Sequence, residues 1–287
     1  MKTITISATL ILAAAGAWAS STINTVNRHA YGANIGWLNF RGDGNNGAVL
    51  GLYYAAGHVW SANAGWISLG TGMPANGHAY ANDSAGDWGV NHDGLGNLRG
   101  YAYGANVGWI AFEDVGNPRV DLLTGNLSGY AWGANVGWIS LSNAMAHVQT
   151  DSIDGGPDTD GDGIPDAWEM QKVGTLVLLG GGGSDHDFDG VADVDEYLAD
   201  TDPDNLHSFF AVTDYVRAGA TNTVTWTVEP TRLYRLETAT AMTNGAVWTD
   251  SGHGVLPPGG GPTLTREVAD PADTGFVRAR AIVPLAP

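Results

Sequence analysis

Carboxylate side chains at alternate positions form the part of this sequence best suited to chemistry. Two twelve-residue segments, 158–169 and 185–196, share the pattern D-x-D-x-D-G-x₅-E. In this pattern alternate residues of a tight loop point oxygens at one centre, the glycine permits the sharp turn, and the final glutamate adds two oxygens. Hard oxygen ligands in this number favour Ca²⁺. The spacing therefore predicts two calcium sites.

The pattern also predicts which residues hold each ion. Side-chain oxygens come from positions 1, 3, 5 and 12, a backbone carbonyl comes from position 7, and the acid at position 9 acts directly or through water. The predicted ligands are Asp158, Asp160, Asp162, Ile164, Asp166 and Glu169 in the first loop, and Asp185, Asp187, Asp189, Val191, Asp193 and Glu196 in the second. Each loop leads into a predicted helix, which begins near position 9.

Acidic residues dominate the segment around these loops. From Asp151 to Asp204 there are 16 acids and one base, Lys172, and such charge repels itself without a cation. The loop-then-helix order resembles thrombospondin type-3 calcium repeats and, more distantly, dockerins, over about residues 151–205. That resemblance implies structural calcium bound by the aspartates. A merely solvated acidic linker is the alternative. We expect calcium to stiffen residues 151–206 into a spacer between two β domains.

A thirteen-residue register that occurs four times precedes the acidic segment. Every copy keeps an aromatic residue followed, one position later, by Ala-Asn-x-Gly-Trp. The copies span residues 28–40, 57–69, 100–112 and 129–141. Asn and Gly tolerate positive φ and suit a turn, whereas the aromatic and aliphatic residues suit strands. The register predicts stacked β-hairpins, each preceded by a third short strand, in a repeat domain over about residues 20–150.

The repeat tryptophans allow two interpretations. They are Trp37, Trp66, Trp109 and Trp138, at intervals of 29, 43 and 29 residues. Because tryptophan is mostly buried on average, we expect an interior ladder shared by the repeats; the alternative is an exposed platform for sugar rings. The middle interval has 14 extra residues near 75–88, which we interpret as an inserted loop, with a decayed repeat unit as the alternative.

The remaining segments complete a mainly β architecture. The repeats resemble glycine- and tryptophan-rich repeats of secreted bacterial proteins of unassigned function, over roughly residues 28–141. Beyond about residue 207, short strand-like runs bounded by Pro, Gly and Asn predict a small β-sandwich over 207–287. The runs are 209–216, 223–228, 233–237, 246–249 and 276–282. This part resembles C-terminal modules that follow such calcium repeats in exported bacterial proteins.

Several features predict export. Residues 1–19 read as a signal peptide, with Lys2, an apolar run and Ala17-Trp18-Ala19 before the cleavage point. No later run is apolar and long enough to span a bilayer. Cysteine is absent, which excludes disulfides and thiolate metal sites, and the net charge of −18 argues against nucleic-acid partners. We expect a protein that is secreted or at the cell surface.

The sequence contains no catalytic motif that we recognise, so we expect no enzymatic activity. A polysaccharide hydrolase is a remote alternative that would need paired carboxylates; the loop acids of the repeats are Asp43, Asp87, Asp93, Glu113 and Asp114. The expected function is structural or adhesive. Homo-assembly through open strand edges of the repeats would fit it. The alternative is a carbohydrate-binding module that recognises surface glycans with the repeat aromatics.

Overall fold

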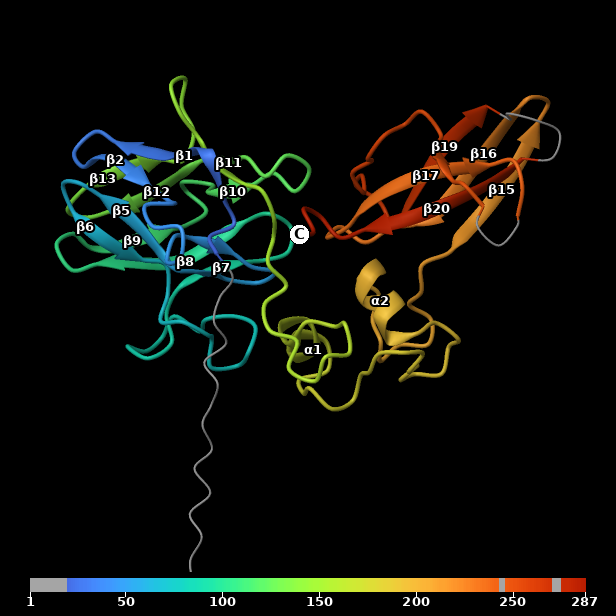
Figure 1. Ribbon diagram of the computed structural model, residues 1–287, viewed down its shortest axis with the longest axis horizontal. Helices are drawn as coiled ribbons and strands as arrows, with labels where there is room; N and C mark the ends of the chain where they lie inside the picture. The colour runs from blue at the N-terminus through green and yellow to red at the C-terminus, as the bar shows by residue number, and fades with distance from the viewer. Residues whose placement is uncertain (1–19, 243–245, 270–274) are drawn as a thin grey trace, which may run out of the picture.

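The computed structural model describes residues 20–242, 246–269 and 275–287 (Figure 1). The predicted signal peptide, residues 1–19, lies outside this range. Within it the chain forms 20 strands and two short helices. The prediction of a mainly β fold is therefore confirmed. Neither helix of the described chain has the length and apolar character needed to cross a membrane.

The four repeats form four β-hairpins in one register. In each, the first aromatic residue lies opposite the tryptophan, as in the pairs Tyr31↔Trp37 and Trp60↔Trp66. The turn glycines have positive φ, 77° at Gly36, which explains why glycine is needed there. The hairpins are β1 (Ile23–Gly32) with β2 (Gly36–Asn39), β5 (His58–Ser61) with β6 (Gly65–Ser68), β8 (Leu98–Gly104) with β9 (Gly108–Phe112), and β12 (Tyr130–Gly133) with β13 (Gly137–Ser140).

The hairpins close into a ring. Strands pair in the order β1-β2-β5-β6-β8-β9-β12-β13, and β13 returns to β1 through Tyr31↔Ser140 and Gly32↔Ile139 (Figure 1). The predicted hairpin repeats thus form an eight-stranded, barrel-like sheet. Every hairpin strand of this ring has a neighbour on both sides. The open strand edges that we expected in the repeat array are therefore absent from it, because the fourth hairpin pairs with the first.

A short strand accompanies each hairpin. Three of these strands come from the residues just before their hairpin: β3 (Val49–Leu50) with β4 (Ala55–Ala56), β7 (Val90–His92) with the start of β8, and β10 (Arg119–Val120) with β11 (Leu127–Ser128). The first hairpin receives its partner from beyond the fourth repeat. There β14 (Val148–Thr150) pairs with β1 through Ile23↔Thr150 and Arg28↔Val148. This exchange ties the two ends of the ring together.

Aliphatic side chains fill the interior of the ring. Opposed buried pairs, such as Ala30↔Leu38 and Val59↔Ile67, form its centre. A further buried layer consists of Phe40, Leu69, Phe112 and Leu141. The space left among these side chains is about 20 Å³, small beside the roughly 150 Å³ of an engineered core cavity. The ring is therefore a packed core.

The four repeat tryptophans lie on the outer surface of the ring. Trp37, Trp66, Trp109 and Trp138 are 45, 45, 49 and 47% exposed, so the expected interior ladder is wrong. Successive side chains of a strand point to opposite faces, and the residue after each tryptophan is buried, as Leu38 is after Trp37. The interior of an eight-stranded ring is narrow enough for side chains to fill it, and here the aliphatic residues do so.

An asparagine in each turn links the hairpins at one end of the ring. Each Nδ2 donates to the carbonyl oxygen of the buried residue between Asn and Gly in the preceding hairpin. The four bonds are Asn63 to Ile35 (3.0 Å), Asn106 to Ala64 (3.1 Å), Asn135 to Val107 (3.0 Å) and Asn34 to Val136 (3.3 Å). We call this set the asparagine ring. Its side-chain bonds run around the whole circle of hairpins, and the backbone pairing of β1 with β13 closes the same circle.

The C-terminal part is the predicted sandwich. One sheet has the order β15-β16-β19 and the other β18-β17-β20, with Trp226, Tyr234 and Leu236 fully buried in the core of this part. The strands are β15 (Val212–Ala218), β16 (Thr221–Thr227), β17 (Leu233–Ala239), β18 (Thr249–Asp250), β19 (Thr263–Ala269) and β20 (Phe276–Ile282). Of these, β19 was not among the predicted runs, although Thr263, Thr265 and Leu264 alternate as a strand does.

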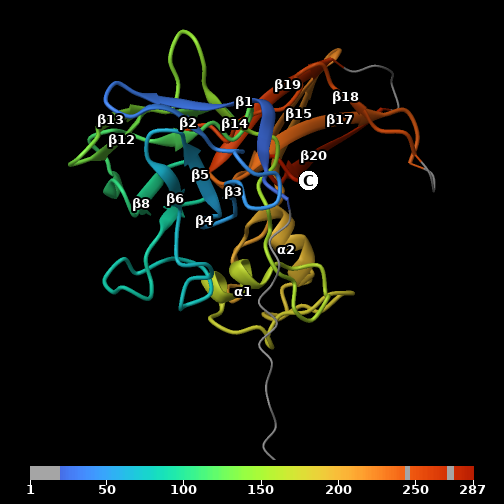
Figure 2. The same cartoon turned by 60° about the vertical axis from the view of Figure 1, so that its left-hand side comes forward.

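The acidic segment packs against both β parts. Its helices, α1 (Asp166–Lys172) and α2 (Asp193–Ala199), lie beneath the ring and the sandwich (Figure 2). Asp200 accepts a hydrogen bond from Trp168 Nε1 at 2.7 Å and contacts Lys172 and, in the sandwich, Arg232. Tyr53 of the repeat part packs on the apolar cluster that contains Trp168. The segment is thus a compact wedge with its own small core, in contact with both of the β parts that we expected it to separate.

Candidate calcium centres and aromatic belt

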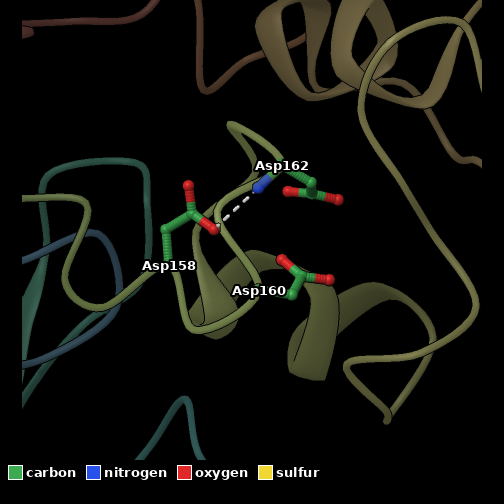
Figure 3. A group of neighbouring side chains, drawn as sticks. All are labelled: Asp158, Asp160 and Asp162. Carbon is green, nitrogen blue, oxygen red and sulfur yellow. Dashed lines mark hydrogen bonds between the residues drawn. The ribbon is translucent and has the colours of Figure 1, made fainter.

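The first acidic loop brings its aspartates together. One oxygen each from Asp158, Asp160 and Asp162 lie within 4.8 Å of one another (Figure 3). The Asp158 carboxylate also accepts backbone N–H groups from Gly161 and Gly163 at 2.8 and 3.0 Å, and from Asp162 at 3.2 Å. These bonds fold the loop tightly around one centre, as the ligand spacing predicts.

Glu169 is the residue at position 12 of the first loop. It is fully buried, and both carboxylate oxygens lack a hydrogen-bond partner in the described chain. Burial, and then the charges of Asp162 and Asp160, raise the pKa of Glu169 to about 7. A buried carboxylate is costly unless it is paired or coordinates a metal. A divalent cation among Asp158, Asp160, Asp162 and Glu169 would satisfy these oxygens, so the residues fit Ca²⁺.

The second loop repeats this arrangement. Oxygens of Asp185, Asp187 and Asp189 lie within 4.8 Å of one another, and in each residue one buried oxygen lacks a partner within the described chain. Glu196 is fully buried, with one oxygen bonded to Thr201 at 3.1 Å and the other unpartnered. Burial raises the pKa of Glu196 to about 7, with the bond from Thr201 opposing the rise. This donor set also suits a hard divalent cation.

The acids at position 9 hold the loops in shape. Asp166 accepts the backbone N–H of Thr159 at 2.7 Å and also its hydroxyl. Asp193 accepts the backbone N–H groups of His186 and Gly180 at 2.8 and 3.0 Å. Neither residue belongs to an aspartate cluster. Their carboxylates therefore join the start of each helix to position 2 of its loop.

The backbone at position 7 of each loop is hydrogen-bonded to the aspartate at position 5. The N–H of Ile164 donates to Asp162 at 2.8 Å, and the N–H of Val191 donates to Asp189 at 2.7 Å. Ile164 is fully buried in the cluster with Trp168 and Leu179. The first loop is thereby anchored to the core of the acidic segment.

The acids considered for hydrolysis are engaged locally. Asp43 accepts bonds from Asn45 and Asn46 of its own turn, and Asp93 does the same with Leu95 and Asn97. Asp87 accepts the N–H groups of Ala75 and Ala81, Asp114 forms an ion pair with Arg99, and Glu113 hydrogen-bonds Tyr101. Each of the five therefore has a structural contact of its own.

Paired aromatic rings surround the ring of hairpins on its outer face. We call these pairs the aromatic belt: Tyr31 with Trp37, Trp60 with Trp66, Tyr103 with Trp109, and Trp132 with Trp138. The ring centroids are 4.9 Å apart in the first three pairs, and all eight side chains are 39–49% exposed. A third aromatic ring, such as His29 at 6.2 Å from Trp37, flanks each tryptophan. The belt is a repeated, solvent-facing aromatic surface.

The long interval between the second and third tryptophans is the predicted inserted loop. No strand lies between Ser68 and Val90 in the described chain. The loop adds Trp88 to the belt, at 5.0 Å from Trp109 and 6.1 Å from Tyr103. Sequence reasoning missed this contact, although Trp88 falls at the end of the inserted stretch. Because the contact is tertiary, its only signal was the presence of aromatic residues, Tyr80 and Trp88, in the inserted stretch.

Comparison with known proteins adds no relative. No family model matches the chain, and no match was found among curated proteins or solved structures. Function is therefore inferred from the acidic loops and the aromatic belt.

Proposed function

We propose that this is an exported adhesive protein whose aromatic belt binds surface glycans and whose acidic segment is fixed by structural calcium. The observation that supports it best is the half-exposure of all eight belt aromatics. Large exposed apolar surfaces on soluble proteins usually mark interaction sites. Here the same surface recurs on four hairpins, whereas packing alone would favour burying it.

The belt suits a ligand with flat apolar faces and many hydroxyl groups. Aromatic rings offer broad contact surfaces for such faces, and the four hairpins repeat them around the ring. Weak contacts to several sugar units of one chain add up through effective concentration. The net charge of −18 disfavours anionic partners. A neutral polysaccharide satisfies all of these conditions.

Calcium would supply rigidity in this proposal. Asp158, Asp160, Asp162 and Glu169 would hold one ion, and Asp185, Asp187, Asp189 and Glu196 the other. Each ion would tie a loop to the helix that follows it. Those helices carry Trp168 and Tyr197, which contact each other at 5.6 Å. The ions would thus stabilise the wedge between the ring and the sandwich.

Self-association is the second candidate, on a different surface. β15 is the edge strand of its sheet, and all seven of its residues are exposed. An exposed edge strand is a template for pairing with another chain. Sedimentation of the mature protein with and without Ca²⁺ tests this route. A monomer at all concentrations would exclude it.

Glycan binding by variant proteins tests the main proposal. The double variant Trp60→Ala/Trp132→Ala removes one ring from each of two pairs, and Phe209→Ala removes an exposed aromatic residue outside the belt. We expect the double variant to lose binding to a glycan array while its melting curve stays near wild type, and Phe209→Ala to bind normally. Undiminished binding by the folded double variant would refute the proposal. Mass spectrometry of exported protein, expected to begin at Ser20, tests export.

A further inference from the structure

The inserted loop and the third hairpin line an open surface pocket of about 470 Å³. Residues 82–85 and Trp88 form one side, and Tyr101 and Trp109 form the other. This volume falls within the range of small-molecule sites, about 300–1,000 Å³. Neither of the other two intervals between hairpins carries such an insertion. The pocket therefore distinguishes the third hairpin from its three equivalents.

Two indoles form a right-angled corner in this pocket. The rings of Trp88 and Trp109 are perpendicular, at 90°, with centroids 5.0 Å apart. The ring of Tyr101 lies 6.1 Å from that of Trp109, at an interplanar angle of 74°. A flat ligand that stacks on one indole would therefore meet the second as a wall. The belt pairs Tyr31–Trp37 and Trp60–Trp66, with interplanar angles near 60°, offer no such corner.

Several contacts hold the inserted loop in place. Tyr80 is buried, its hydroxyl donates to the Gly72 carbonyl, and its ring contacts Tyr54 at 5.5 Å. The Asp87 carboxylate accepts the backbone N–H groups of Ala75 and Ala81. The Asn82 side chain accepts the N–H of Gly89 at 2.9 Å. A site that is already formed loses less entropy on binding. These contacts fix the loop that carries Trp88 before any ligand binds.

Polar groups with free bonding capacity line the loop side. Asp83 and Ser84 are exposed, and within the described residues their side chains make no hydrogen bond to the protein. A carboxylate accepts several hydroxyl groups, and a serine hydroxyl both donates and accepts. Apolar walls with a few convergent polar groups are the usual composition of a specific ligand site. The acid also makes the pocket unfavourable for anionic sugars.

We propose that this pocket binds a neutral hexopyranose unit of a polysaccharide. The apolar face of the sugar ring stacks on an indole of the Trp88–Trp109 corner, and its hydroxyl groups bond to Asp83 and Ser84. This inference rests on the proposed glycan-binding function and assigns the primary subsite to one hairpin. The remaining belt aromatics would then contact further units of the same chain.

Calorimetric titration of the calcium-loaded mature protein tests the pocket. The probes are cellohexaose and mannohexaose, with an oligogalacturonate of the same length as the anionic comparison. We expect a neutral hexamer to bind, and Trp88→Ala to weaken binding by at least about tenfold, the equivalent of about 1.4 kcal/mol. Asp83→Asn, at an exposed position, should weaken it severalfold without altering the melting curve. Phe209→Ala, at an exposed aromatic residue outside the belt and the pocket, should bind within twofold of wild type.

The outcomes separate the pocket from the belt. Trp37 belongs to the belt but not to the pocket, so Trp37→Ala should weaken hexamer binding less than Trp88→Ala does. Equal losses in the two variants would overturn the pocket as the primary subsite and leave the belt proposal standing. Glycan-array binding that depends on Trp60 and Trp132 but not on Trp88 or Asp83 would do the same. Preference for oligogalacturonate would overturn the assignment to neutral sugars. If neither the array nor any hexamer shows binding, both proposals fail.

Discussion

The side chain of Asn34 in the first hairpin donates to the carbonyl oxygen of Val136 in the fourth, at 3.3 Å and across 102 residues of chain. The same bond joins each of the other hairpins to the one before it. The Asn34 bond differs because it closes the circle. The turn glycine beside each acceptor has room for this side chain: a Cβ on Gly137 would lie 3.2 Å from Asn34 Nδ2.

Removal of this closing bond should weaken the ring measurably. Asn34→Ala leaves the Val136 carbonyl without its partner, and we expect a loss of about 0.5–1.5 kcal/mol in the free energy of unfolding. Urea denaturation followed by tryptophan fluorescence measures it. Asn45→Ala, in an exposed turn where the side chain makes no bond within the described chain, is the matched control. Equal stability of the two variants would show that the closing bond contributes nothing.

The second hairpin differs from the others in two residues that face each other at its turn. It has Ser61 and Ala64 where the third has Gly104 and Val107. A Cβ on Gly104 would lie 2.7 Å from Val107 Cγ2, too close for an undistorted contact. Gly104→Ser should therefore destabilise the protein by about 1–3 kcal/mol through overpacking.

A second substitution should relieve that clash. Gly104→Ser with Val107→Ala reproduces the pair found in the second hairpin, so the double variant should be more stable than the sum of the single effects by about 0.5–3 kcal/mol. A double-mutant cycle from urea unfolding gives this coupling, with Val107→Ala as the reference. If the losses in unfolding free energy are additive, the side chains at positions 104 and 107 do not compete for the same space.

Calcium should bind to both acidic loops and stabilise the fold. Dissociation constants of about 10⁻⁴–10⁻³ M are typical of extracellular modules, and about 10 mM Ca²⁺ at the tighter limit adds about 2.7 kcal/mol per site. Calorimetry should detect two sites, and EDTA should lower the melting temperature. Glu169→Gln should abolish one site. No binding heat and an unchanged melting curve would show that the loops hold no calcium.

Total charge needs its own control in that experiment. Asp195 is an exposed acid of α2 outside the predicted ligand set. Asp195→Asn removes the same charge as Glu169→Gln but should leave both sites and the Ca²⁺-dependent rise in melting temperature intact. Equal weakening by both variants would indicate diffuse attraction to an acidic segment.

Asp200 should make the protein sensitive to acid. Burial raises the pKa of Asp200, but the charges of Arg232 and Lys172 and the bonds from Thr231 and Trp168 outweigh it and hold the pKa below its ordinary value of 3.8. A depressed carboxyl pKa contributes stability that is present above the ordinary value and is lost as pH falls through the folded value. The unfolding free energy should therefore drop below about pH 4.

A neutral amide at this position tests the cause. Asp200→Asn leaves Arg232, only 4% exposed, without its ion pair, and breaking such a buried pair costs about 3–5 kcal/mol. We expect lower stability at pH 7 and a flatter acid dependence below pH 4, measured by urea unfolding across pH. Asp195→Asn should keep the wild-type slope. An unchanged slope in Asp200→Asn would place the acid sensitivity elsewhere.

Local patterns were sufficient for much of this protein. The four hairpins, the two acidic loops with their helices, and most sandwich strands follow from residues at most thirteen positions apart. Turn chemistry and ligand spacing act within such distances, so Asn-x-Gly-Trp identifies a hairpin and D-x-D-x-D-G identifies a loop. The strand β19 was missed because its alternation is short and follows a run of Pro and Gly.

Only the tertiary structure decided which face of each hairpin is inside. Trp37 and Leu38 are both apolar and point to opposite faces of the hairpin, so the alternation alone allowed either face to be the interior one. The average burial of tryptophan favoured the face of Trp37, which is the outer one. Closure of the ring between β1 and β13 encloses Leu38 and turns Trp37 outward. That closure, the supply of β14 to the first hairpin, and the contact of Trp88 with Trp109 depend on residues 21 to more than 100 positions apart. Pairing over such distances is set by the packing of the whole ring, which no local pattern encodes.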